Sequence, residues 1–95
     1  MPAYVIAEID ITDPEAYKEY QVAVPATVDK YGGRFLVRGG RIVAKDGGWD
    51  PKRVIVIQFP SIEAAEKWYH SAEYAPLLDI RLKATKSRLI ITEGQ

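Results

Sequence analysis

The sequence contains no cysteine, and this absence excludes several kinds of chemistry. Disulfides, thiolate nucleophiles and cysteine-ligated metals cannot occur, and the composition agrees with a reducing compartment. Only one histidine is present, so a single chain cannot supply a metal site built from several imidazoles. We therefore expect neither a resident metal nor a tightly bound cofactor.

The chain also lacks an excess of charge of either sign and has no long apolar run. Acidic and basic residues number 13 each, so electrostatics gives no reason to expect nucleic acid or an anionic membrane as a partner. No apolar stretch approaches the roughly 18 residues of a membrane span. The N-terminus leads into a strand pattern and not into a signal sequence, so we expect a cytoplasmic protein.

A length of 95 residues limits the size of the hydrophobic core. It corresponds to a single domain over residues 1–95, near the lower end of the usual range. A chain of this size buries roughly 60–65% of the surface that its unfolded form exposes. The core is therefore modest, and a second subunit would add stability.

Residues 53–60 form the most apolar segment of the chain. Four β-branched residues stand in a row at 54–57 and Phe59 follows, a pattern typical of a strand. A strand with one face in water alternates apolar and polar residues, whereas a continuous run indicates that both faces are covered. We therefore expect the sheet that contains this strand to be buried on both sides.

Three further segments alternate as strands do, at residues 3–11, 34–38 and 87–93. In the second of these, strict alternation places Phe35 and Val37 on one face. It places Arg34, Leu36 and Arg38 on the other face, where we expect the two arginines to form an anion site or to pair with acidic residues at positions 8 and 10. Residues 41–52 form a long connection, with a short edge strand expected over 41–45 and a turn at 46–48.

The first helical segment follows the first strand. Asp13 as N-cap with Pro14 after it is typical of a helix start, and the glycine pair at 32–33 ends the helix. Pro25 lies inside the segment, removes the hydrogen bond to the carbonyl of Gln21 and predicts a kink or a split. The apolar stripe of this helix consists of Tyr17, Tyr20, Val24, Val28 and Tyr31.

The second helical region is predicted in two pieces. Ser61 is the expected N-cap of a helix that runs to about His70. Ser71 is the expected N-cap of a second helix over residues 72–85, with Pro76 in or near its first turn, where proline is tolerated.

The order strand, helix, strand, strand, helix, strand predicts an α+β fold. It is that of a ferredoxin-like βαββαβ sandwich, in which an antiparallel four-stranded sheet carries the helices on one face. Burying even four large apolar residues of the opposite face would contribute ~6–12 kcal/mol per subunit before association costs. The sequence thus predicts a homodimer packed through these sheet faces with twofold symmetry. The apolar residues of that face are Tyr4, Ile6, Leu36, Val54, Val56 and Ile90.

Several motifs together resemble one known family. They are the tyrosines at 17 and 20, Lys30-Tyr-Gly-Gly-Arg-Phe-Leu-Val-Arg-Gly-Gly40, Phe59-Pro60-Ser61, and Trp68-Tyr-His-Ser-Ala-Glu-Tyr74 with Arg81. Over about residues 3–94 the chain resembles the family labelled domain of unknown function 1330. The resemblance implies a dimeric α+β barrel of ferredoxin-like protomers, as in small monooxygenases, muconolactone isomerases and stress-response barrel proteins. The position of His70 departs from the aspartate frequent in that family, which argues against a family-wide role for the imidazole.

Arg81 is the strongest candidate for a functional residue. On a helix that begins near residue 72, it falls in the middle of an apolar face. A guanidinium in such a place must be paired or must meet an anion. Two interpretations remain open: a clamp for a carboxylate or enolate between helices and sheet, or an internal pair with Glu8, Asp10 or a backbone carbonyl.

The remaining candidates are aromatic residues and the single histidine. Trp68, His70 and Tyr74 surround the expected break between helices, either as a pocket wall with proton-handling groups or as plain core and turn. Tyr17 and Tyr20 lie beside the proline, either as pocket lining or as core.

The predicted function is the binding of a small anionic or carbonyl compound in a pocket between helices and sheet. If the protein is an enzyme, we expect cofactor-free isomerisation or oxygenation by acid–base chemistry. The alternative is a dimeric binding or accessory module without catalysis. The catalytic candidates are His70, Tyr74 and Arg81, and the ligand-binding candidates are Tyr17, Tyr20, Trp68, Tyr74 and Arg81.

Overall fold

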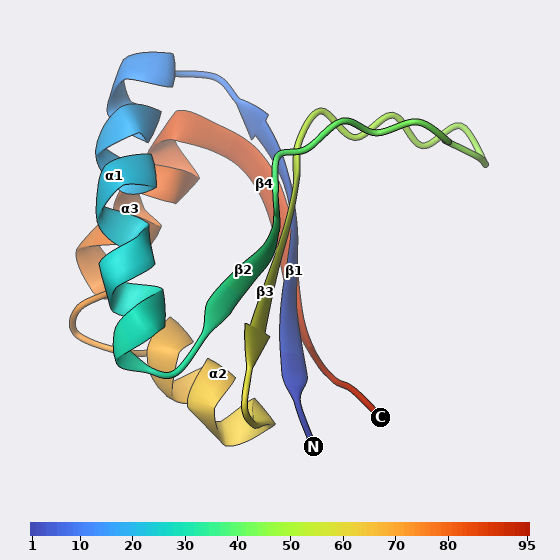
Figure 1. Ribbon diagram of the computed structural model, residues 1–95. Helices are drawn as coiled ribbons and strands as arrows, with labels where there is room; N and C mark the ends of the chain where they lie inside the picture. Colours follow the sequence, from blue (N-terminus) through green and yellow to red (C-terminus); the bar gives the residue numbers. More distant parts are fainter.

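The computed structural model describes residues 1–95 and contains one sheet with three helices on one of its faces (Figure 1). The strands lie in the order β2-β3-β1-β4, and every neighbouring pair is antiparallel. The predicted ferredoxin-like α+β sandwich is thus confirmed. The elements are β1 (Ala3–Ile11), α1 (Pro14–Lys30), β2 (Arg34–Arg38), β3 (Val54–Phe59), α2 (Ile62–Tyr69), α3 (Ala75–Ala84) and β4 (Thr85–Glu93).

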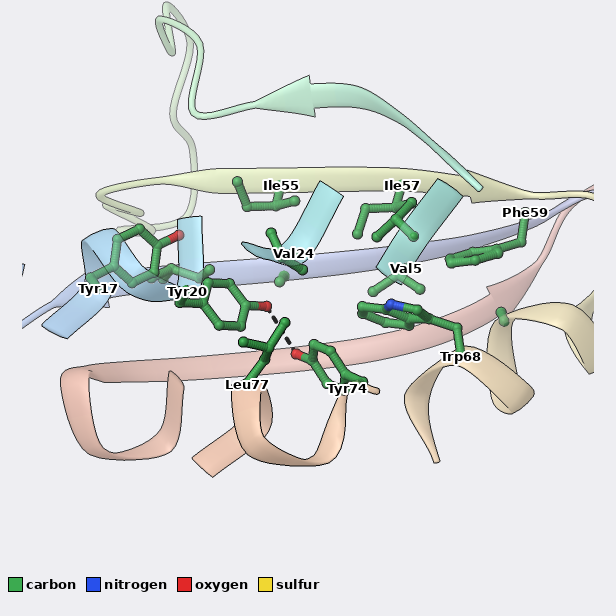
Figure 2. Packing of buried hydrophobic residues seen from close by; sticks show 14 of the residues in the cluster. Val5, Tyr17, Tyr20, Val24, Ile55, Ile57, Phe59, Trp68, Tyr74 and Leu77 are labelled. Carbon is green, nitrogen blue, oxygen red and sulfur yellow. Dashed lines mark hydrogen bonds between the residues drawn. The ribbon is translucent and has the colours of Figure 1, made fainter. Parts of the chain in front are cut away.

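The hydrophobic core lies between the sheet and the helices. Alternate residues of β1 are buried, as are alternate residues of β3, because period-2 alternation turns one face of each strand toward the helices. Phe59 packs against Trp68 of α2, with ring centroids 5.5 Å apart (Figure 2). The core is therefore closed at one end by aromatic rings. No helix is both long enough and apolar enough to pass through a membrane.

Helix α1 begins as predicted and is not split by its proline. The Asp13 side chain accepts a hydrogen bond from the amide of Ala16, and α1 continues through Pro25 to Lys30 as one 17-residue helix. Packing of the buried stripe against the sheet outweighs the loss of one backbone hydrogen bond, so the proline costs the helix a bond but does not end it.

The chain between α2 and β4 differs from the prediction at two boundaries. Ser71 does cap a turn, since its Oγ accepts from the amide of Tyr74 at 3.1 Å, but residues 72–74 remain a turn and α3 starts at Ala75. Pro76 has no amide hydrogen, so it cannot donate the backbone hydrogen bond that would extend α3 toward residue 72. Strand β4 begins at Thr85, two residues earlier than predicted, because this β-branched residue is already extended and pairs with Ile11.

Residues 41–52 form an arm and contain no edge strand, so that prediction was wrong (Figure 1). Gly39 ends the pairing of β2, with its amide on the carbonyl of Val54 and a φ of +74° that favours glycine. The chain then leaves the sheet on the side away from the helices. The predicted turn near 46–48 is present, with the amide of Trp49 bonded to the carbonyl of Asp46.

A β-bulge in β2 corrects the predicted faces of this strand. Phe35 pairs with Ile57, but Val37 pairs with Val56, so one extra residue, Leu36, is inserted between two partners. A shift of one residue moves every following side chain to the opposite face. Val37 is therefore on the outer face of the sheet, and Arg38 lies on the helix side. Neither residue follows the strict alternation.

Candidate functional site

Arg81 is buried between α3 and β4, with only 3% of its surface exposed. Its Nε donates to the hydroxyl of Tyr74 at 3.2 Å and its Nη1 donates to Ser87 Oγ at 2.7 Å. Both partners are neutral hydroxyls, and none of the ion pairs in the molecule includes Arg81. The interpretation as an internal ion pair is therefore not supported, and the guanidinium remains a buried charge without a counter-charge.

Two tyrosine hydroxyls extend this contact into the core (Figure 2). The hydroxyl oxygens of Tyr20 and Tyr74 lie 2.9 Å apart, and the Tyr74 oxygen also accepts from Arg81. Two hydroxyls carry two protons, but the bond between them uses only one. The remaining proton has no acceptor among the hydrogen bonds of the protein. The cluster thus offers a guanidinium and an O–H donor to an incoming acceptor.

Both phenols stay protonated at neutral pH. Burial raises the pKa of Tyr20, and the neighbouring Tyr74 raises it further. Burial is also the main cause that raises the pKa of Tyr74, while the bonds from Tyr20 and Arg81 oppose that shift. Because a phenol with a raised pKa holds its proton, these side chains are suited to donating hydrogen bonds and not to abstracting protons.

A small cavity adjoins Arg81 beneath the sheet. Its volume is about 20 Å³, which is room for a water molecule but not for an organic compound. Strand residues form apolar walls, and the lining contains no carboxylate and no histidine. An organic occupant would therefore require lining side chains to move. The polar and aromatic lining residues are Tyr17, Tyr20, Gln21, Phe35, Arg38, Arg53, Trp68 and Arg81.

The structure brings most of the predicted site residues together. Arg81 and Trp68 line the cavity along with both tyrosines of α1, and Tyr74 is completely buried with its hydroxyl on Arg81. The Trp68 ring centroid lies 4.2 Å from that of Tyr74. His70 is not part of this group, since it is the exposed C-cap of α2 and its ring meets only the edge of Tyr69 at 5.3 Å.

Two further arginines line the cavity. Arg38 was expected with Arg34 at an anion site or in an ion pair on the outer face of the sheet, and Arg53 was not predicted as a site residue. Arg38 reaches the cavity because the bulge turns it to the helix side, and its Nη2 donates to the carbonyl of Gln21 at 2.6 Å. This is the carbonyl that Pro25 leaves without a helical partner. Arg53, just before β3, also lines the cavity. The sequence already showed that Pro25 leaves the Gln21 carbonyl without a helical donor. It did not show that Arg38 is the donor, because this depends on a bulge that hydrophobic alternation does not reveal.

The bond between Arg38 and the Gln21 carbonyl can be tested with a double-mutant cycle. We expect Arg38→Met to lower the free energy of unfolding by about 0.5–1.5 kcal/mol. In a Pro25→Ala background the same change should cost nearly nothing, because the amide of residue 25 then takes the carbonyl. Urea denaturation measures both values, with Arg34→Met on the outer face as a matched control. An equal loss in both backgrounds would show that another contact holds Arg38.

Comparison with known proteins places the chain in a family. Residues 2–95 match the family described as "Domain of unknown function (DUF1330)". The chain belongs to this family. The resemblance inferred from the tyrosine, glycine-arginine and tryptophan motifs is thereby confirmed. Among curated proteins, none matches this sequence.

Several solved structures share the fold at low sequence identity. A protein of unknown function from Rhodopseudomonas palustris is 18% identical, with a TM-score of 0.75 over 99% of this chain and 82% of that chain. The cofactor-independent oxygenase SnoaB of Streptomyces nogalater is 9% identical, with a TM-score of 0.70 over 99% and 93%. A dimeric ferredoxin-like protein of unknown function from Jannaschia sp. CCS1 is 8% identical, with a TM-score of 0.75 over 99% and 100%. At these identities the similarity shows the fold alone.

Proposed function

We propose that this family member binds a small organic anion between sheet and helices, with Arg81 as the charged anchor. The observation that carries the proposal is the burial of Arg81 beside a cavity with only neutral hydroxyls as partners. Removing a guanidinium from water is costly unless a counter-charge compensates. A carboxylate in the cavity supplies that charge, and the planar guanidinium fits its two oxygens.

The neighbouring residues have defined roles in this proposal. The unused hydroxyl proton of the Tyr20–Tyr74 pair donates to the bound anion, and Tyr74 also holds the guanidinium in place. Trp68 and Tyr17 form the flat aromatic walls of the site. Such a site is mostly apolar with a few directed donors, as small-molecule sites usually are.

A binding function is better supported than acid–base catalysis by these residues. The cavity lining contains no carboxylate or histidine that could serve as a base, and the raised pKa values of the tyrosines keep them protonated. His70 lies on the surface outside the lining, so its proposed catalytic role has no geometric support.

A second candidate is cofactor-free chemistry on a compound that brings its own acidity, such as an activated phenol or an enolisable carbonyl. The favouring observation is that Arg81 and Tyr20 both line the cavity and that the Tyr20–Tyr74 pair has one hydroxyl proton to spare, since oxyanion stabilisation requires such donors. The similar fold of a cofactor-independent oxygenase adds an analogy at the level of the fold only. Turnover of such a compound, lost in Arg81→Met, would separate this candidate from simple binding.

Small carboxylates and phenols provide the test of binding. At a ligand concentration 100 times the Kd, binding stabilises the folded state by about 2.7 kcal/mol. We therefore expect at least one compound to raise the Tm of the protein by several degrees. Arg81→Met should weaken its binding tenfold or more. Arg81→Lys, which keeps the charge but not the planar fork, should be intermediate, and Arg34→Met on the outer face should bind normally.

The outcomes of this screen are distinct. The circular dichroism spectrum of each variant first shows whether it folds. If no carboxylate or phenol raises the Tm of the native protein, the proposal fails. Equal binding by the native protein and by a folded Arg81→Met variant would place the anion elsewhere and remove Arg81 from the site.

The second part of the proposal is a homodimer that packs the outer faces of two sheets. Four large apolar side chains of the strands are exposed on this outer face. Proteins rarely leave such a contiguous patch in water. Two of the similar structures are described as dimeric, which supports a dimer but not this particular interface. The four residues are Ile6, Leu36, Val37 and Ile90.

The arm of residues 41–52 supports the same arrangement. It extends from the sheet on the side opposite the helices (Figure 1). Its Trp49 donates a hydrogen bond to Glu8 at 3.1 Å, and Glu8 also pairs with Arg88. The bonds from Arg88 and Trp49 lower the pKa of Glu8, so this carboxylate stays ionised between its two donors. The arm thus borders the apolar face, where a second protomer would meet it.

A further inference from the structure

Arg53 has an unusual lack of hydrogen-bond partners. Its Nε is buried and bonded to nothing, and its Nη2 reaches only the carbonyl of Arg38 at 3.5 Å. Buried polar groups are nearly always paired, so an unpaired donor at a cavity requires an explanation. A missing acceptor at this point is the simplest one.

Arg38 lies beside Arg53 and is also free of any ion pair. Its guanidinium packs over the ring of Phe35 at 4.8 Å and makes one bond, to the carbonyl of Gln21. This leaves most of its five N–H donors unused. Because Arg38 is exposed, it can also leave that carbonyl and open the cavity.

Gly39 leaves room for the guanidinium of Arg53 at this place. A β-carbon at position 39 would lie 2.0 Å from Nη1 of Arg53, so any other residue would displace the Arg53 head. The glycine is also required by its φ of +74°. Gly39 therefore has two roles: its backbone conformation ends β2, and its missing side chain leaves space for Arg53.

Arg53 and Arg81 line the cavity from opposite sides of β1. The carbonyl of Arg53 accepts from the amide of Ile9, and Ile9 pairs on its other side with Ser87, the residue that holds Arg81. Arg53 and Ser87 are thus two strand spacings apart across β1, on the order of 10 Å. The side chain of Ile9 lies between them in the apolar lining. The site therefore has positive charge at both ends and an apolar centre.

We propose that Arg38 and Arg53 form a second anion subsite at the mouth of the cavity, so that the occupant is a short dicarboxylate. One acid group meets Arg81 and the other meets Arg53 and Arg38, with an apolar spacer over Ile9. This inference rests on the proposed function, because it assumes that Arg81 anchors an anion. The small volume of the cavity means that Arg38 moves aside as the ligand enters.

Matched pairs of compounds test the second subsite. Glutarate and isophthalate carry two acid groups, and their monomethyl esters keep the shape but carry one. By isothermal titration calorimetry, we expect each diacid to bind at least tenfold more tightly than its monoester. Arg53→Met should reduce this ratio to less than threefold without weakening the monoester. Arg38→Met, at an exposed position, provides a second variant that should also reduce the ratio.

Two controls separate the second subsite from the first. Arg34→Met, on the outer face of the same strand as Arg38, should leave the ratio unchanged, and Arg81→Met should weaken diacid and monoester alike. A ratio near one in the native protein, with monoester binding still dependent on Arg81, would overturn the second subsite and leave the proposed function intact. If neither compound of either pair binds the native protein, while another carboxylate still binds in an Arg81-dependent way, the second subsite is overturned and the proposed function stands.

Discussion

Ile6→Asp is expected to convert a dimer into a folded monomer, with a rise of at least about a thousandfold in the dissociation constant. Ile6 is 36% exposed on the central strand β1, between Val56 and Ile90 on its two neighbours. In a face-to-face dimer, twofold symmetry brings both new carboxylates into one apolar interface. Burying ionised carboxylates without partners costs several kcal/mol, and ~4 kcal/mol already corresponds to a thousandfold change.

Analytical ultracentrifugation over a series of protein concentrations measures this effect. Val22→Asp is the matched control, because Val22 is also an exposed apolar residue, 81% exposed, but lies on helix α1 away from the outer face. It should leave the dimer intact. A native protein that sediments as a well-folded monomer at micromolar concentration would contradict the sheet-face dimer, as would equal effects of the two aspartates.

The fold was predictable because each element has a strong local signal. The unbroken apolar run of β3, the Asp13-Pro14 start of α1 and the Ser61 cap of α2 each depend on residues close in sequence. The error that affects the site lies where one residue shifts a whole pattern. The bulge at Leu36 reverses the faces of Val37 and Arg38, and hydrophobic alternation contains no sign of it.

The candidate site was predictable only in part, for a related reason. Arg81 lies seven residues after Tyr74, the N-cap of α3, so helical periodicity places the two residues on the same side of the helix. Ser87 and Arg53 meet the site only through the pairing of β4 and β3 with β1, which is set by tertiary structure. The sequence therefore indicated the anchor but not the charges opposite it.

Trp68→Ala is expected to lower the free energy of unfolding by about 3–5 kcal/mol. Trp68 is only 1% exposed, and its indole ring lies between Phe59 and Tyr74 (Figure 2). Its Nε1 donates to Thr27 Oγ1 at 3.0 Å, which links α2 to α1. The alanine would remove these contacts and join the vacated space to the existing cavity. Because domains of this size have a stability of about 5–15 kcal/mol, the variant would be close to unfolding.

Urea denaturation at a fixed protomer concentration measures this loss, since dimerisation also contributes to the apparent stability. Trp68→Phe keeps an aromatic ring but loses the bond to Thr27, so its cost should be smaller than that of the alanine variant. Leu82→Ala, at a position of α3 that is 60% exposed, should change the free energy of unfolding by less than about 0.5 kcal/mol. A loss at position 68 no larger than that at position 82 would mean that the indole is not packed in the core. The aromatic wall of the proposed anion site would then have no support, because the ring that defines it would be in solvent.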